Sequence, residues 1–469
     1  MSELSNHEYL RAVLRNDFPS FVARVFATVS PGDIYQNNWH VHAITHQLER
    51  VQTGDCSRLI ITMPPRCLKS IAGSVAFPAW LLGHDPSIRV LAVSYAEGLA
   101  EKLALDCVKV IESAWYRECF PATRIAKGRS ARADFETTRG GGRFSTSIGG
   151  TLTGRGGDII IIDDPHKPDE ATSDAKRNKV IDWYRTTLLS RLNAPSTDPI
   201  VLIQQRVHEG DLAGELIEQG GWEHLNLPAI AELDAAYDLG RRGTKRVHQG
   251  DLLHTSRLPK ALLDQRKEEL GSYVFAAQYQ QRPSPIEGGL VKWHWFQTYD
   301  TPPNVYEGGQ MVQSWDTAIR AEQNSDYSVC TTWLVRQKRA WLLDVIRLKL
   351  EFPELQKSIV SEAKKWKATR VLIEQAGSGH QLLQHFSRTG YPRVWGIQPK
   401  NDKATRLMSV TPAIESGRVT IPQDAPWLES FRRELLLFPN GRHDDQVDSL
   451  SQFLLWLEQT YHGPLVGHY

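Results

Sequence analysis

The sequence predicts an α/β protein with two domains of different architecture. From residue 58 onward, short aliphatic runs alternate with helical stretches, which is typical of a parallel sheet covered by helices. In the second half of the chain, three apolar runs follow one another directly before helices appear, as in an antiparallel meander. A length of 469 residues with 41% hydrophobic content is sufficient for two separate cores.

Composition limits the classes of function. The net charge is only +1, so a nucleic-acid partner would have to be bound by local basic stretches. Two such stretches, 124–143 and 240–246, are rich in Gly or Ser and are predicted to be exposed loops, although solvated loops without a partner explain each equally well. The five cysteines form no C-x-x-C pair, which argues against zinc and a disulfide framework and fits a reducing cytosol. No apolar run approaches the ~20 residues that span a bilayer, so we expect a soluble protein with no membrane partner.

The first half is predicted to contain four buried strands separated by helices. The helical stretches lie at 97–113 and 173–192. The strands are the runs 58–63, 89–95, 158–162 and 200–204. Because ligands of parallel α/β sheets bind at the carboxyl ends of the strands, the residues that follow these runs are the first candidates for a site.

The first strand runs into "MPPRCLKS", residues 63–70. A phosphate-binding loop would carry two glycines here, but only Lys69 and Ser70 fit that pattern. The two prolines stiffen the loop, so we predict a cradle of N–H groups from Arg66 through Cys67 to Ser70, with Leu68 at negative φ and its side chain packed away from phosphate. The alternative is that Leu68 blocks close approach to phosphate. Arg66 would reach a phosphate or pair with a carboxylate.

The third strand, "DIIIID", ends in Asp163 and Asp164. In a nucleotide triphosphatase, Lys69 and Ser70 would face phosphates and Mg²⁺, and a carboxylate on this strand would hold the same ion. A second acid at this point could orient the attacking water. Each motif alone is usually a helix start or a turn, but their convergence at one sheet edge favours a nucleotide site.

Four stretches in this half resemble the ATPase motifs of the large terminase subunit of tailed bacteriophages. They are "MPPRCLKS", "SYAEGLA" (94–100), "GTLTGRGGDIIIIDDP" (150–165) and "VLIQQRVHEGDLAG" (201–214). The resemblance implies a P-loop (RecA/ASCE-like) ATPase that uses ATP and Mg²⁺. Lys69 would be its phosphate lysine, Ser70 and Asp163 would serve Mg²⁺, and Asp164 would take the place of the usual catalytic Glu.

Two further roles come from this resemblance. Arg155, in the Gly-rich "TGRGG", would complete a neighbouring subunit's site as an arginine finger, although contact with DNA or solvent is equally expected. The segment 34–49 resembles the adenine-contacting segment of the family, with Tyr35 and Gln36 as the contacting residues; packing and helix capping are the alternative.

The predicted domains are an ATPase domain at 1–225, a lid or linker subdomain at 226–289 and a nuclease domain at 290–469. The boundary lies in the Pro- and Gly-containing stretch 278–293, which has no sustained periodicity. After it, strands are predicted at 310–316, 327–335, 340–347, 370–374 and 393–398, with helices at 352–367 and 380–389. This is the element order of a ribonuclease H-like fold.

Acidic residues occur where that fold brings strand ends together. Asp316 lies in the first strand, Glu374 ends the fourth, and "HDDQVDS" (443–449) opens the last helix, where Asp444 and Asp445 cannot be separated as the third metal ligand. Such a cluster would hold two Mg²⁺, with Mn²⁺ as a substitute, for in-line attack of water on a phosphodiester. Asp326 and Asp448 are secondary metal-site candidates, and His443 would cap the helix or contact phosphate.

These stretches also resemble the terminase nuclease motifs. The resemblance implies a viral DNA packaging motor that translocates DNA into the prohead through the portal and an endonuclease that cuts concatemeric DNA. The implied partners are double-stranded DNA, the portal protein, the small terminase subunit and further copies in a ring on the portal, with a monomer in solution. The implied location is the host cytoplasm, transiently at the prohead and not in the mature virion. A helicase-nuclease of DNA repair and a catalytically inactive DNA-binding scaffold are the alternatives.

Overall fold

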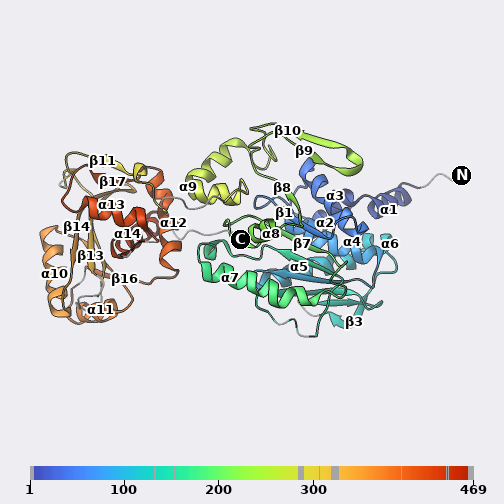
Figure 1. The fold of residues 1–469 in the computed structure, drawn as a ribbon, viewed down its shortest axis with the longest axis horizontal. Helices are drawn as coiled ribbons and strands as arrows, with labels where there is room; N and C mark the ends of the chain where they lie inside the picture. Colours follow the sequence, from blue (N-terminus) through green and yellow to red (C-terminus); the bar gives the residue numbers. More distant parts are fainter. Residues whose placement is uncertain are drawn as a thin grey trace. The chain divides into compact units, whose positions relative to one another are not determined.

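The computed structural model of the chain forms two compact units (Figure 1). The described residues are 5–130, 134–150, 152, 154–283, 290–305, 307–317, 327–391, 393–439, 441 and 443–462. The first unit comprises residues 1–266 and 273–284, and the second comprises 267–272 and 285–469. Most of the predicted lid segment thus packs with the first unit, and its role as a lid stays a prediction. All five cysteines are buried free thiols, and no helix within the described residues is long and apolar enough to cross a membrane.

The first unit is built on one large sheet with the strand order β3-β4-β5-β2-β6-β7-β1-β8. Its strands from β5 to β8 in that order pair in parallel. The four predicted strands are confirmed as β1 (Arg58–Thr62), β2 (Arg89–Ser94), β6 (Ile159–Asp163) and β7 (Ile200–Gln204). The site candidates that follow β1 and β6 therefore lie on the same side of the sheet, where the parallel strands have their carboxyl ends.

The prediction of loops for the two basic stretches was wrong. The stretch 124–143 forms β3 (Ile125–Ser130), β4 (Phe135–Thr137) and the start of β5 (Gly142–Ser147), which extend the sheet at one edge. The stretch 240–246 contains a short 3₁₀ turn and the start of β10 (Thr244–Val247), which pairs with β9 (Ala235–Asp238). Their many Gly, Ser and charged residues gave no apolar run, because edge strands are not buried on both faces. β8 (Glu223–Asn226), at the other edge, was missed for the same reason.

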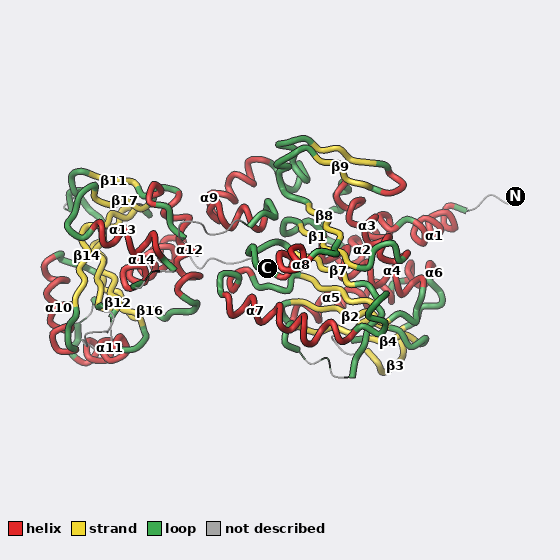
Figure 2. Tube along the Cα trace, in the orientation of Figure 1, coloured by secondary structure: helices red, strands yellow, loops and turns green. Residues whose placement is uncertain are grey.

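Helices lie on both faces of this sheet (Figure 2). Alternate residues of each strand supply the two cores: Leu59 and Ile61 face one cluster, and Ile60 faces the other. The helices of the unit are α1 (Asn6–Asn16), α2 (Phe18–Val29), α3 (Trp39–Thr53), α4 (Phe77–His84), α5 (Glu97–Glu112), α6 (Ala114–Cys119), α7 (Asp174–Trp183), α8 (Leu212–Gln219) and α9 (Lys260–Gln278), the last of which crosses the boundary between the units. The helix predicted at 173–192 is therefore shorter, and continues as a π turn and a 3₁₀ turn.

The second unit contains a mixed sheet with the order β11-β17-β14-β13-β12-β15-β16. Its strands are β11 (Gln297–Tyr299), β12 (Gln310–Asp316), β13 (Ser328–Arg336), β14 (Arg339–Leu348), β15 (Arg370–Glu374), β16 (Val394–Ile397) and β17 (Val419–Pro422). The helices are α10 (Phe352–Lys365), α11 (Ser378–Arg388), α12 (Lys403–Glu415), α13 (Leu428–Leu437) and α14 (Asp445–His462). The first three long strands form the predicted antiparallel meander, and β12 pairs in parallel with β15. The predicted element order is confirmed.

Helix α14 is fixed against the sheet of the second unit by one reciprocal pair of hydrogen bonds. The Ser314 hydroxyl donates to the Ser449 carbonyl at 2.8 Å, and the Ser449 hydroxyl donates to the Ser314 carbonyl at 2.8 Å. Nearby, the rings of Trp333 and Phe453 stack with centroids 4.2 Å apart. These contacts place the acidic start of α14 beside the end of β12.

Candidate functional site

The loop after β1 turns through two left-handed residues. Arg66 has a φ of 62° and Leu68 a φ of 68°, so the prediction of a negative φ for Leu68 was wrong. The chain must turn from the strand into the helical segment that begins at Lys69 within a few residues, and this turn is made with positive φ even where no glycine is present. The left-handed conformation costs an ordinary residue roughly 1–2 kcal/mol. The Leu68 side chain packs against the core, as predicted, and compensates part of that cost.

His40, near the start of α3, contacts this loop. The His40 side chain, 1% exposed, lies with Nε2 3.3 Å from the Cys67 carbonyl and Nδ1 2.8 Å from the Asn38 amide nitrogen. Since a carbonyl only accepts and the amide nitrogen only donates, the Nε2–H tautomer fits both contacts. Burial, with the neighbouring His254 as a smaller cause, lowers the pKa of His40 to about 3. Residue 67 is therefore held by a neutral imidazole.

The predicted adenine-contacting residues, Tyr35 and Gln36, precede His40 in the chain. The Tyr35 ring lies 5.5 Å from the Phe26 ring, and burial raises the pKa of its hydroxyl to about 12. Gln36 is exposed. The packing of Tyr35 agrees with the structural alternative, and contact with adenine stays a prediction for both residues.

The ends of β1 and β6 converge as the sequence predicted. The Lys69 ammonium lies 2.8 and 2.6 Å from the two carboxylate oxygens of Asp164, and the Ser70 hydroxyl donates to Asp163 Oδ1 at 3.1 Å. Both partners of the first pair are largely buried. Four residues from two distant segments thus form one polar cluster at the carboxyl ends of the parallel strands.

Asp163 is suited to a divalent cation. Its side chain is 1% exposed, and among the described residues Oδ2 has no hydrogen-bond partner. Burial first, and then the charge of Asp164, raises the pKa of Asp163 to about 6. A buried carboxylate oxygen beside a serine hydroxyl matches the oxygen ligands that Mg²⁺ prefers, so Ser70 and Asp163 fit the predicted ion.

Asp164 is held by the neighbouring strand as well as by Lys69. The Gln205 N–H donates to Asp164 Oδ1 at 2.9 Å, and Asp164 itself has a φ of 44°. Beside it at the end of β7, Gln204 is 1% exposed, and both polar atoms of its side chain lack a hydrogen-bond partner within the described chain. No role was predicted for these glutamines; the signal was a pair of amides where a buried strand ends.

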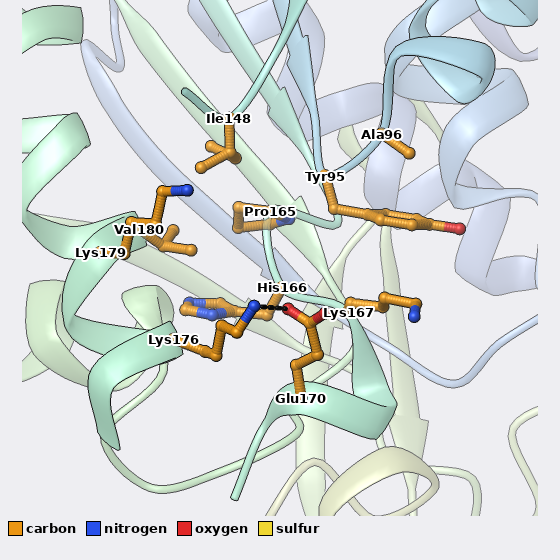
Figure 3. A pocket seen from close by; sticks show the side chains of 10 residues that line it. All are labelled: Tyr95, Ala96, Ile148, Pro165, His166, Lys167, Glu170, Lys176, Lys179 and Val180. Atoms are coloured by element: carbon orange, nitrogen blue, oxygen red, sulfur yellow. Dashed lines mark ion pairs between the residues drawn. The ribbon is translucent and has the colours of Figure 1, made fainter. Parts of the chain in front are cut away.

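A pocket of about 270 Å³ opens on the side of β6 away from β1 (Figure 3). Three lysines line it: Lys167 follows β6, and Lys176 and Lys179 come from α7. Lys176 lies 3.7 Å from Glu170, and Lys167 lies 2.7 Å from Asp169. The pocket also contains His166, whose Nε2 accepts a hydrogen bond from the Leu212 N–H at 2.8 Å, so its other ring nitrogen carries the proton of the neutral form. The lining is therefore rich in hydrogen-bond donors and positive charge.

Arg155 lies on the loop before β6 and is half-exposed. Its guanidinium forms an ion pair with Asp134 and lies 5.3 Å above the Phe144 ring. An arginine finger would have to leave Asp134, and this role stays a prediction.

In the second unit, the end of β12 meets the end of β15. Trp315 pairs with Ile373, which brings Asp316 and Glu374, the next residue of each strand, to neighbouring positions. Burial raises the pKa of Asp316 well above its usual range, and the charges of Asp448, Glu374 and Asp445 raise it further, in that order. The three predicted acids are therefore close enough to interact.

The structure changes the ranking of the acids on α14. Asp448, a secondary candidate in the sequence, is 3% exposed and belongs to the cluster, whereas Asp444 is half-exposed and pairs with Lys403. Asp445 is 4% exposed and lies 3.8 Å from Arg347. Asp326 lies outside the described residues. The His443 ring packs edge-on against the Tyr327 ring, with the ring centroids 5.7 Å apart. This packing tests neither the predicted helix cap nor the predicted phosphate contact of His443.

Two cations from α12 enter the acidic cluster and were not predicted. Arg406 contacts Glu374 at 3.1 Å and Asp448 at 2.7 Å, and Lys403 contacts Asp444 at 2.8 Å and Asp448 at 2.7 Å. In the described parts of the chain, no three His, Cys, Asp or Glu side chains are arranged to hold a metal ion as they stand. The donor set nevertheless fits Mg²⁺ or Mn²⁺, because these ions prefer carboxylate oxygens and the pKa of Asp316 is raised by burial and by the neighbouring acids, whose repulsion a bound cation would relieve.

Comparison with known proteins agrees with this geometry. Residues 313–457 match the family model of the terminase RNaseH-like domain. No curated protein matches the sequence significantly. Among solved structures, the large terminase of a thermophilic bacteriophage is similar over 87% of this chain and 97% of its own, with a TM-score of 0.50 and 11% identity.

Two further structures are similar at lower TM-scores. The same bacteriophage large terminase in complex with ATP-gamma-S has a TM-score of 0.49 and 12% identity over 87% of this chain and 98% of its own. The large terminase nuclease of the thermophilic phage G20c with bound magnesium has a TM-score of 0.30 and 15% identity over 36% and 98%, respectively. From the family model and the first structure, the second unit contains a terminase RNaseH-like domain and the chain as a whole has the fold of a phage large terminase.

Proposed function

We propose that this protein is the ATPase and DNA endonuclease subunit of a viral DNA packaging motor. One observation carries the proposal: in each unit, residues that are distant in the sequence come together where elements of its sheet and its helices begin or end. In the first unit Lys69 and Ser70 meet Asp163 and Asp164. In the second unit Asp316 interacts with Glu374, Asp445 and Asp448. A chain with both clusters would couple nucleotide hydrolysis to work on DNA and also cut it.

In the first unit, the residues of the chain have separable tasks. ATP would bring phosphate oxygens to Lys69, which would leave Asp164 to neutralise them. Ser70 and Asp163 would hold Mg²⁺, which supplies charge neutralisation of the phosphates when bound. Released from Lys69 but still fixed by the Gln205 N–H, Asp164 would orient the attacking water.

In the second unit, Asp316, Glu374 and Asp445 would hold the divalent ions, and Asp448 would contribute from the next turn of α14. Two Mg²⁺ or Mn²⁺ would activate water and stabilise the leaving oxygen of the phosphodiester. The chain's own contribution is to keep the acids at the ends of β12, β15 and α14, where the reciprocal Ser314 and Ser449 hydrogen bonds fix them.

Packaging defines the partners of the proposal. Double-stranded DNA would be moved by the first unit, and the lysines of the pocket in Figure 3 suit its phosphates. The portal protein, the small terminase subunit and further copies of this chain in a ring would complete the motor. The protein would act in the host cytoplasm while docked on the prohead, would leave before the virion matures, and would be a monomer in solution.

The test uses the full chain with Mg²⁺ or Mn²⁺, supercoiled plasmid and ATP. We expect both ATP turnover and plasmid cutting. Lys69→Ala should abolish ATP turnover and packaging into proheads but retain cutting. Asp316→Ala should retain ATP turnover but abolish cutting. Ordinary ATP turnover in Lys69→Ala would exclude this loop as the nucleotide site.

A helicase-nuclease would be expected to carry a second RecA-like sheet. The second sheet is instead mixed, with an antiparallel meander at its centre. We therefore rank this alternative below packaging, and a strand-displacement assay on forked DNA distinguishes the two because only the helicase would separate the strands.

A further inference from the structure

Two cations on one helix are bound to the nuclease acids in different ways. Lys403 and Arg406 lie one turn apart near the start of α12, which Asp402 caps by accepting from the Thr405 N–H at 3.0 Å. The Arg406 side chain is 9% exposed, and that of Lys403 is 47% exposed. One cation is thus enclosed by protein, and the other is accessible to solvent.

Arg406 bridges two acids that belong to different elements. One of its nitrogens lies 3.1 Å from Glu374 on β15, and the other lies 2.7 Å from Asp448 on α14. A planar guanidinium holds two such partners in a fixed geometry, and a buried carboxylate that lost its partner would be strongly destabilised. Arg406 therefore sets the separation between Glu374 and Asp448.

Lys403 also contacts two acids, but from the solvent side. Its ammonium lies 2.8 Å from Asp444 Oδ1 and 2.7 Å from Asp448 Oδ2. A lysine has one compact charge on a flexible stem, so it can withdraw without disturbing its neighbours. Because like charges repel, an ammonium and a divalent cation compete for the same carboxylate oxygen, and the accessible Lys403 is more easily displaced than the enclosed Arg406.

We propose that Lys403 is an exchangeable counter-ion of the nuclease acids and that Arg406 is their permanent positioning residue. Lys403 neutralises Asp444 and Asp448 in the metal-free protein and gives up this place when a divalent metal binds. Arg406 keeps Glu374 and Asp448 at a fixed separation both with and without the metal. This inference rests on the proposed nuclease function.

The test measures metal affinity instead of cutting. Mn²⁺ is titrated calorimetrically into the full chain, with Asp163→Asn in every arm to remove the candidate site of the first unit. Lys403→Met keeps the aliphatic stem but removes the competing charge. We expect it to bind Mn²⁺ roughly three- to tenfold more tightly than the parent, as expected for the loss of two partly exposed ion pairs.

Lys365→Met is the matched control. Lys365 is 53% exposed in the same unit and pairs with Asp344 at 3.4 Å and Glu362 at 3.1 Å, outside the acidic cluster. Its replacement removes the same charge and should leave Mn²⁺ affinity unchanged. Without metal, Lys403→Met should melt at a lower temperature than the parent, and saturating Mn²⁺ should close that gap.

Arg406 is tested by the conservative change. Arg406→Lys keeps the charge but replaces the planar guanidinium, which fixes two partners, by a single ammonium that holds the two acids less firmly, so Mn²⁺ affinity should fall severalfold. Affinity equal to that of the parent would overturn the positioning role. Equal or weaker binding in Lys403→Met would overturn the exchange while leaving the nuclease assignment intact. A parent that neither binds Mn²⁺ nor cuts DNA would overturn the proposed nuclease and this inference together.

Discussion

The Lys69 ammonium lies 2.6 Å from a carboxylate oxygen of Asp164, and both side chains are largely shielded from water. This pair joins the loop after β1 to the end of β6 across the intervening strand β7. In the absence of nucleotide, the charge that would bind phosphate is thus neutralised by the acid that would orient water. Nucleotide binding and activation of Asp164 would be one event, because phosphate must displace the carboxylate from Lys69.

Asp164→Asn separates the two roles of this pair. The variant removes the competitor for Lys69 but retains a side chain of the same shape, so ATP should bind at least as tightly as in the parent. Turnover should fall by about 10²–10⁴-fold, because the variant loses the group that we propose to act as general base. Fluorescent-nucleotide titration and phosphate release measure the two quantities.

The control for Asp164→Asn is Asp169→Asn, which removes an exposed carboxylate paired with Lys167. It should change neither quantity. If Asp164→Asn turned over ATP at the parental rate, Asp164 would have no catalytic role.

Leu68 tests the cost of a left-handed leucine. Leu68→Ala loses the packed side chain and keeps the unfavourable φ of 68°, whereas Leu68→Gly loses the side chain and relieves that strain. The glycine variant should therefore be more stable than the alanine variant by ~1 kcal/mol, the reverse of their order in a helix. Urea unfolding of the two variants measures the difference.

ATP turnover should change only modestly in both Leu68 variants, because Lys69 stays in place. A large gain in ATP affinity and turnover for Leu68→Gly would instead mean that the side chain obstructs phosphate. The two measurements are independent, since urea unfolding reports the free energy of the folded state relative to the unfolded chain, whereas ATP turnover reports the function of the phosphate loop.

His40 predicts an acid-labile first unit. Its pKa is lowered from 6.5 to about 3 in the folded protein, so the unfolded chain binds the additional proton between these values. The free energy of unfolding must therefore fall as the pH drops below 6.5, by up to ~1.4 kcal/mol per pH unit for this group. His40→Gln, which does not titrate, should show a shallower fall between pH 6.5 and 4.5 in urea midpoints.

Other buried histidines keep part of the pH dependence in that variant. Burial also lowers the pKa of His166, His208 and His224 to about 4 each. Parallel curves for the parent and His40→Gln would show that His40 is protonated in the folded state at these pH values.

Asp316→Asn should dissociate activity from stability. The neutral amide cannot replace a carboxylate metal ligand, so plasmid cutting should fall by at least about 10²-fold while ATP turnover is retained. Because burial and three neighbouring acids raise the pKa of Asp316, its ionised form destabilises the fold near pH 7. The metal-free variant should therefore melt at a higher temperature than the parent.

Asp424→Asn, at an exposed position of the same unit, is the control for this stabilisation and should have no effect. A lower melting temperature for Asp316→Asn would contradict the inferred repulsion among the acids.

The sequence predicted the buried framework of both units but not their polar edges. Strands such as Ile159–Asp163 are buried on both faces, so their apolar runs are unambiguous. β3 and β8 are the edge strands of the first sheet and β4 lies next to β3, and all three carry mixed residues, which look like loops in the sequence. The convergence of Lys69, Ser70, Asp163 and Asp164 followed from the expectation of a parallel sheet, whose strands have their carboxyl ends on one side.

The partners of the acids could not be predicted in the same way. Lys403 and Arg406 stand about thirty residues from Glu374 and forty from Asp444 and Asp448, and their contacts depend on how α12 packs against α14. The sign of φ at Leu68 was also inaccessible, because a leucine gives no indication of a left-handed turn that the loop imposes. Tertiary geometry decides both features.

The reciprocal hydrogen bonds between Ser314 and Ser449 limit how the acidic cluster of the second unit can be rearranged. A shift of α14 along its axis by a single residue would move it about 1.5 Å and break both bonds at once. Sliding α14 along β12 would therefore cost both bonds, which opposes movement of Asp448 toward or away from Asp316 along the helix axis. We therefore expect control of this cluster to come from what approaches it, whether a metal ion, a side chain from α12 or the DNA of the proposed function, while the carboxylates stay where the sheet holds them.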